Sequence, residues 1–262
     1  MNDWLHNLPI AWMALLVFGL TAFGTTAIYV VVMALSVGER ARSFKAVSPG
    51  LLSPLGILFA LFIAFTATQV WSDNDKATSV VDREASALRN VVILAASFPG
   101  EAETRLRKLI RSYIADAAAQ EWPMMAHRTA TLQIVPYSLT EALQLVLSFT
   151  PSGQGQQTAQ REITTSLENA WDARRQRIIM SHSEVNWIKW LCLSLQAACA
   201  LVAIAMVHID DRLASAITMG LFGIGVAASM LLILAHDRPF TGQLAVTPNP
   251  LLQVMPEVGA AQ

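Results

Sequence analysis

Four long runs of apolar residues dominate the pattern along the chain. They cover residues 8–37, 51–72, 185–207 and 213–235. A helix needs about 20 predominantly apolar residues to cross the hydrocarbon core of a bilayer, and each run is long enough. The pattern therefore predicts four transmembrane helices. We do not expect the first run to be a cleaved secretory signal, because it is too long and no basic segment precedes it.

A different pattern fills the stretch between the second and third runs. Apolar side chains there recur every three or four residues, as on one face of a helix. We expect helices over about residues 73–97, 101–120, 138–149 and 158–183, with a flexible loop at 151–157. Pro123 is expected to end the second of these helices, and Ser138 with Glu141 to form a capping box that opens the third.

The predicted fold class is an all-α membrane protein with four transmembrane helices. A helical extramembrane subdomain, residues 73–184, is inserted between the spans of residues 1–72 and those of residues 185–236, and residues 237–262 form a C-terminal tail. Four spans place both termini and the subdomain on one side of the membrane. The short connections on the other side carry Arg40, Arg42, Lys45 and Arg212, and this weakly favours a cytoplasmic location for the connections instead of the subdomain.

The second run has two unlike faces when it is wound at about 100° per residue. One face grades from apolar to charged, through Leu55, Leu58, Phe62, Phe65, Thr66 and Gln69 and then Asp73 and Lys76. The other carries small residues, Gly56, Ala60, Ala64 and Ala67, which let membrane helices approach closely. Two interpretations are open from the residues alone. The graded stripe lines a water-filled path through an oligomer, or it packs inside the protein with its Thr and Gln bonded to a neighbour or to their own backbone.

Composition and charge narrow the function classes. Hydrophobic residues make up 54% of the chain and charged residues 14%, against about a quarter charged in soluble domains. The lipid bilayer is therefore an expected partner, and the net charge of −1 indicates no nucleic acid. Neither a metal or cofactor motif nor a nucleophile–base pattern is present, so we expect no enzyme, metal or cofactor. The glycine-rich residues 220–225 lie inside a span and indicate close helix packing.

Several segments together resemble the bestrophin-like domain family of bacteria and plants, a domain of unknown function. They are the second span from Leu55 to Trp71, residues 82–85 (DREA), residues 106–122 (LRKLIRSYIADAAAQEW) and the arginine cluster at 174–177. After the fourth span comes an acidic-Arg-Pro-Phe-x-Gly turn, formed here by Asp237, Arg238, Pro239, Phe240 and Gly242. The resemblance covers nearly the whole chain.

The chain is more distantly similar to the bestrophin ion channels, whose second span carries a neck of apolar residues four apart. That neck falls here on Pro54, Leu58 and Phe62, although Gln69-Val70-Trp71 stands where bestrophins carry an Arg-Trp-Trp type segment. The resemblance implies a homo-oligomer, a pentamer, in the cell's inner (plasma) membrane, with the termini and subdomain in the cytoplasm. Inorganic ions would pass along an axis lined by Leu58, Phe62, Phe65, Thr66 and Gln69, with Asp73 and Lys76 at the mouth.

A function from another class fits the same residues. The stripe could seal a dry axis, and the protein would then be a non-conducting membrane scaffold or sensor whose helical subdomain binds a partner. Ion passage through liposomes that contain the purified protein distinguishes the two functions.

Overall fold

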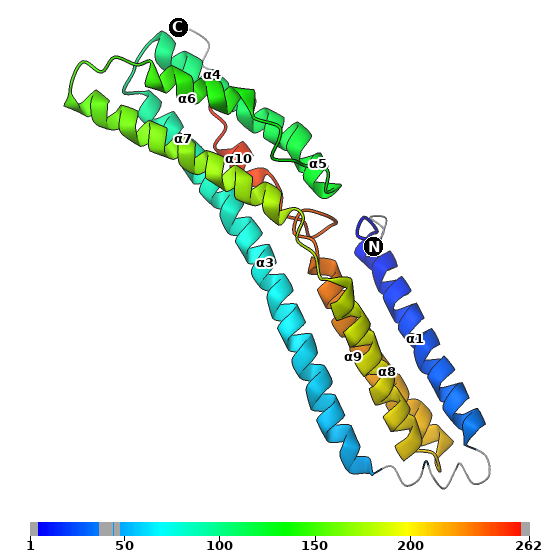
Figure 1. The fold of residues 1–262 in the computed structure, drawn as a ribbon. Coiled ribbons are helices and arrows are strands. Elements are labelled where there is room, and N and C mark those ends of the chain that lie inside the picture. Colours follow the sequence, from blue (N-terminus) through cyan, green and yellow to red (C-terminus); the bar gives the residue numbers. More distant parts are fainter. Residues whose placement is uncertain (1–4, 37–43, 45–47, 258–262) are drawn as a thin grey trace. The chain divides into compact units, whose positions relative to one another are not determined.

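The computed structural model describes residues 5–36, 44 and 48–257 of the 262-residue chain. Helices joined by turns and loops make up this described part, and it contains no strand (Figure 1). The all-α fold class predicted from the sequence is confirmed. The chain divides into two compact units. The membrane unit contains the described residues up to Ser72 and Glu184–Asp237, and the helical unit contains Asp73–Ser183 and the described residues from Arg238 onward.

The membrane unit holds the long apolar helices. They are α1 (Ile10–Leu35), the first part of α3 (Leu52–Ala95), α8 (Trp187–Val207) and α9 (Arg212–His236). Within the described residues, 4 helices are long enough and apolar enough to span a membrane, with mean hydropathies of 2.1 or 2.2. The span on α3 is counted from Pro49 and so includes the short 3₁₀ turn before this helix. The four predicted spans are confirmed. The side chains of Asn186 and Asp211 accept hydrogen bonds from the first backbone N–H groups of α8 and α9 and fix where these helices begin.

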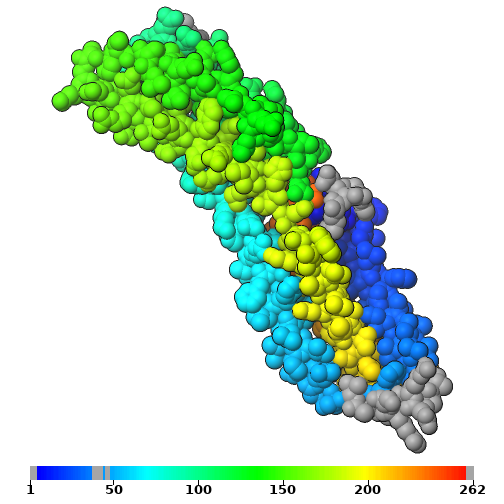
Figure 2. Space-filling model, viewed as in Figure 1, coloured from blue at the N-terminus to red at the C-terminus, as the bar shows by residue number. Residues whose placement is uncertain are grey.

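Packing inside the membrane unit gives α3 a buried side and an exposed side. Phe59 and Val70 of α3 are buried in a cluster with Leu193 of α8 and Val226 of α9. The rings of Phe59 and Phe222 lie 5.5 Å apart between centroids, and the surface of α3 is visible beside that of α8 in Figure 2. Helix α1 packs on α9 through a separate cluster. The predicted close packing at the glycine-rich segment holds for Gly223, where an added Cβ would lie 2.8 Å from Thr25 Oγ1, but an added Cβ at Gly220 or Gly225 meets nothing within 4 Å.

The helical unit is built on the second part of α3, residues 73–95. Its other helices are α4 (Glu101–Asp116), a π-helix (Ala117–Glu121), α5 (Trp122–Ala126), α6 (Tyr137–Leu147), α7 (Gln154–Met180) and α10 (Asn249–Gln253). Their apolar faces form one core, in which Leu88, Ile110, Leu139 and Ile163 are fully buried. The C-terminal segment joins this core through Phe240 and Leu251.

Three local predictions in the helical unit are wrong. Pro123 lies in the first turn of α5 and ends no helix, because the wider π-turn before it carries the chain on and a first-turn proline needs no N–H partner. The predicted capping box does not form. Helix α6 begins at Tyr137, the hydroxyl of Ser138 donates to Ser112, and Glu141 pairs with Arg105 at 2.8 Å. Helix α7 begins at Gln154, so the second half of the predicted 151–157 loop is helical.

Candidate functional site

The exposed side of α3 in the membrane unit carries most of the stripe predicted from the sequence. Leu58 is 58% exposed and Phe65 is 67% exposed, and Gln69 is exposed on the same side. Phe62 lies at the edge of this side, where it packs partly against the cluster between α3, α8 and α9. The exposed side of α3 therefore carries the large apolar side chains of Leu58 and Phe65, followed one helical turn later by the polar side chain of Gln69.

Thr66 does not share this exposed surface. It is 3% exposed, and its hydroxyl donates to the carbonyl of Phe62 at 2.9 Å. Gln69 Oε1 accepts a hydrogen bond from Lys189 Nζ of α8. These are the two bonds that the packed-helix interpretation expects of a Thr and a Gln. The structure thus keeps Leu58, Phe65 and Gln69 together and separates Thr66 from them.

The small-residue face of α3 is uncovered at its centre. Ala60 and Ala64 are exposed, Gly56 is half-buried with no atom within 4 Å of an added Cβ, and Ala67 is buried. An exposed small-residue surface is one on which a further membrane helix can approach closely.

Asp73 and Lys76, the predicted mouth residues, belong to the helical unit. Lys76 Nζ lies 3.7 Å from Asp73 Oδ1, and both side chains are solvent-accessible. Because exposed pairs of this kind are screened by water, the pair contributes little to stability.

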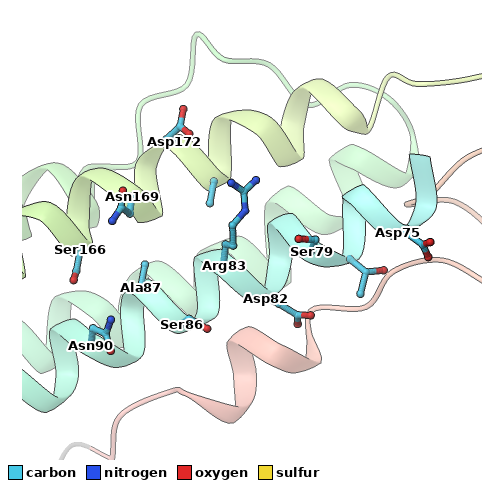
Figure 3. A pocket seen from close by; sticks show the side chains of 12 residues that line it. Asp75, Ser79, Asp82, Arg83, Ser86, Ala87, Asn90, Ser166, Asn169 and Asp172 are labelled. Atoms are coloured by element: carbon cyan, nitrogen blue, oxygen red, sulfur yellow. The ribbon is translucent and has the colours of Figure 1, made fainter. Parts of the chain in front are cut away.

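A polar groove lies between α3 and α7 in the helical unit, with a volume of about 690 Å³. Figure 3 shows the side chains of both helices that line it. Arg83 donates to Gln176 at 2.6 Å, and Gln176 donates in turn to Asp172 at 2.7 Å, so the single cation of the groove is held in place. Polar residues at helical spacing occur on any solvated helix face, and the sequence therefore gave no signal for this groove.

A buried charge network, formed by Glu84, Tyr113, Glu121, Arg174 and Arg177, lies in the core of the helical unit. Glu84 and Arg177 are both 0% exposed and share two hydrogen bonds, of 2.7 and 3.1 Å. Arg177 also donates to Glu121 at 2.9 Å, and its guanidinium carbon lies 4.4 Å from the centre of the Trp122 ring. The Tyr113 hydroxyl donates to Glu84 at 2.5 Å. Arg174 donates to Glu121 at 2.8 Å, so two cations and two carboxylates balance each other.

This environment shifts the pKa values of two members. Burial raises the pKa of the Tyr113 hydroxyl well above its usual value, and the negative charge of Glu84 raises it further. Burial by itself lowers the pKa of Arg177, but the charge and hydrogen bond of Glu84, together with Tyr113 and Glu121, outweigh this effect, and the resulting pKa lies above the usual one. Arg177 is therefore a permanent cation at the centre of the helical unit.

Sequence reasoning missed this network, although a signal was present. Glu84 falls among the apolar positions of α3, between Val81 and Leu88, and Arg177 follows the buried Ala173 by one turn. A charge on the buried face of an amphipathic helix needs a charged or hydrogen-bonding partner. The sequence marked the arginines as a cluster before the third span, but nothing in it identified Glu84 as a partner 93 positions away.

The acidic-Arg-Pro-Phe-x-Gly turn follows α9, and each residue of this motif has a contact, a buried position or a backbone conformation that stabilises the turn. Asp237, in the membrane unit, accepts a hydrogen bond from the backbone N–H of Val185 at 2.6 Å and lies 3.7 Å from His6 Nε2. In the helical unit, Phe240 is buried edge-on against Trp122 with ring centroids 6.1 Å apart. Gly242 has a φ of +90°, a conformation that favours glycine. Pro239 accepts from Val246 N–H at 2.7 Å, and Arg238 is buried. These residues fix the backbone after the fourth span.

Comparison with known proteins agrees with this architecture. A family model for the bestrophin-like domain matches residues 18–251. No curated protein matches the chain. A single-residue variant of a bacterial bestrophin homologue from Klebsiella pneumoniae is similar in fold, with a TM-score of 0.71 at 13% identity, covering 92% of this chain and 97% of that one. The structure of that homologue phased with zinc gives a TM-score of 0.61 at 13% identity, covering 94% and 96%.

At these identities the structural similarity establishes the fold alone, whereas the family match extends over most of the chain. The resemblance to the bestrophin-like domain family noted in the sequence is confirmed. This membrane protein belongs to the bestrophin-like domain family.

Proposed function

We propose that the protein is the subunit of a homo-oligomeric ion channel in the cell's plasma membrane. By resemblance to bestrophins the oligomer is a pentamer, and the α3 helices surround its axis. One observation carries the proposal: Leu58 and Phe65 are exposed on α3 while the opposite side of the same helix is packed against α8 and α9. Family membership gives this uncovered apolar surface its interpretation as a pore lining.

The exposed stripe would act as a barrier to ions. A ring of Leu58, Phe62 and Phe65 side chains makes an apolar constriction, and such constrictions gate by losing their water. An ion that enters a dry ring gives up its hydration, which costs free energy because no polar group replaces the water. The edges of the phenyl rings are weakly positive and can face a passing anion. The opposite charges of Asp73 and Lys76 set no preference for one sign of ion.

Contacts between subunits have a surface available on the same helix. Ala60 and Ala64 are exposed at helical spacing about 120–160° away from Leu58. A neighbouring helix can approach the backbone closely there, since neither residue carries more than a methyl group. The stripe and the small-residue face would then serve two purposes, conduction and assembly.

The test compares two exposed aliphatic side chains of the same size on α3. Leu58 is 58% exposed and Ile57 is 63% exposed, but they point about 100° apart around the helix. Leu58→Ala should raise ion flux through liposomes because it widens and wets the constriction. Ile57→Ala should leave flux unchanged, since that side chain lies off the stripe. Equal flux from the two variants, at equal folding and assembly, would contradict the proposed pore lining.

A non-conducting scaffold or sensor is the alternative function. The polar groove of about 690 Å³ between α3 and α7 favours it, because a partner could bind there. Correctly assembled protein that passes no ions, either unmodified or as Leu58→Ala, would support this alternative and exclude the channel.

A further inference from the structure

A second hollow lies in the membrane unit, between α1 and α9. This α1–α9 groove has a volume of about 540 Å³, and its lining includes Ala22, Thr25 and Tyr29 of α1 with Ala216, Gly220 and Gly223 of α9. The groove is open because small side chains form its floor. An added Cβ at Gly220 would meet no atom within 4 Å.

The groove faces away from the side of α9 that packs on α3. Phe222 and Val226 meet the cluster that contains Phe59 of α3. At about 100° per residue, Gly223 and Gly220 are turned about 100–160° from Phe222. Because α1 and α9 are both apolar membrane-spanning helices, a molecule that fills this groove must be apolar over most of its length.

Thr25 of α1 packs against Gly223 of α9 at the floor of the groove. Thr25 is 9% exposed, and its hydroxyl has no hydrogen-bond partner among the described residues. The neighbouring Thr21 and Thr26 each donate to the carbonyl four residues back, at 2.8 Å. The Thr25 oxygen has almost no accessible surface and faces Gly223, where an added Cβ would lie 2.8 Å away, so this hydroxyl lies between the two helices and not on the open surface of the groove.

The backbone of Arg212 lies at one end of the groove. The hydroxyl of Tyr29, a lining residue, donates to the backbone carbonyl of Arg212 at 3.4 Å, so this end lies at the start of α9. Arg212 is exposed and forms no ion pair with any described residue. From Tyr29 to Phe18, at the other end of the lining, α1 rises about 16 Å, which is close to half of the roughly 30 Å hydrocarbon core.

From these observations we propose that the α1–α9 groove binds an anionic phospholipid. One acyl chain lies along the small-residue floor, and the phosphate lies beside Arg212. The apolar lining selects a lipid chain, its length matches one leaflet, and the charge of Arg212 selects an anionic headgroup. The site is independent of the proposed ion conduction.

Native mass spectrometry of the intact protein tests the proposal, with phosphatidylglycerol and phosphatidylcholine offered in equal amounts. Gly220→Leu fills the groove, and Gly225→Leu is its matched control on α9, because an added Cβ meets open space at both positions and only Gly220 lines the groove. Gly220→Leu should lose the tightly bound phosphatidylglycerol, and Gly225→Leu should keep it. Circular dichroism and subunit number should be the same for both variants.

The headgroup is tested separately. Arg212→Gln should lower the preference for phosphatidylglycerol over phosphatidylcholine by about fivefold, the factor expected of one basic residue at an anionic surface. Equal phosphatidylglycerol binding by Gly220→Leu and Gly225→Leu would overturn the proposal. So would a smaller subunit number in Gly220→Leu alone, because the groove would then hold a second copy of the chain.

Discussion

Arg177→Met removes the cation at the centre of the buried charge network. Methionine keeps an unbranched side chain of similar length, so that the lost charge and hydrogen bonds dominate the effect. The variant loses two hydrogen bonds to Glu84, one to Glu121 and the contact with Trp122. Glu84 then remains 0% exposed, with the Tyr113 hydroxyl as its remaining side-chain donor.

Removing one partner of a buried ion pair costs about 3–5 kcal/mol, because the other charge stays buried and unpaired. A domain's whole unfolding free energy is about 5–15 kcal/mol, so the helical unit should lose a large part of its stability. The double variant Glu84→Leu/Arg177→Met should lose less than the single one, since it leaves no unpaired carboxylate at position 84. Urea unfolding in mild detergent, followed by tryptophan fluorescence and far-UV circular dichroism, measures both changes.

Arg105→Met is the control for this prediction. Arg105 pairs with Glu141 at 2.8 Å, but its side chain is 55% exposed, and solvent screening leaves such a pair little effect on stability. If Arg177→Met unfolds at the same urea concentration as Arg105→Met, or if the double variant is less stable than the single one, the network does not hold the helical unit together.

The remaining predictions concern pH and orientation. The pKa of Tyr113 is raised above its usual value of 10.0, so its stabilising effect is fully present below about pH 10 and is lost as the pH rises through the raised value. Tyr113→Phe should therefore reduce the loss of stability above pH 10. It should also lower the unfolding free energy at pH 7 by about 1.5–3 kcal/mol, because the hydrogen bond to Glu84 is gone. If the unfolding free energy of the variant fell with pH above 10 as steeply as that of the unmodified protein, this prediction would be wrong. By resemblance to bestrophins we expect the termini and the helical unit in the cytoplasm, so Gly153→Cys, in a background with Cys192 and Cys199 replaced, should resist an impermeant thiol reagent added outside intact cells. Labelling from outside would show that the charges of the short connections predict the orientation correctly.

The membrane-spanning helices could be predicted from sequence because their length and composition are set by the bilayer. The first span was expected over residues 8–37 and is found at Ile10–Leu35. Boundaries in the helical unit were less predictable where tertiary partners decide them. Glu141 pairs with Arg105, which lies 36 positions away and cannot be identified from a local capping pattern.

Helical periodicity predicts which residues of the candidate site share one face of α3, but it does not predict which part of that face is buried. Winding at about 100° per residue places Thr66 on the same stripe as Phe62 and Gln69. Which edge of the stripe is buried depends on where α8 and α9 pack, and they cover the side that carries Phe59 and Val70. The buried charge network could not be predicted from the sequence either, because its partners come from helices that are far apart in the sequence and meet only in the folded protein.

Ion flux after chemical modification of single cysteines on α3 tests the central claim most directly. Gln69 and Thr68 are both exposed, but their side chains point about 100° apart. In a background with Cys192 and Cys199 replaced, a charged thiol reagent should change ion flux through liposomes that contain Gln69→Cys and leave Thr68→Cys unaffected. Equal effects on the two variants, or no effect on Gln69→Cys despite its labelling, would contradict an ion path along this side of α3.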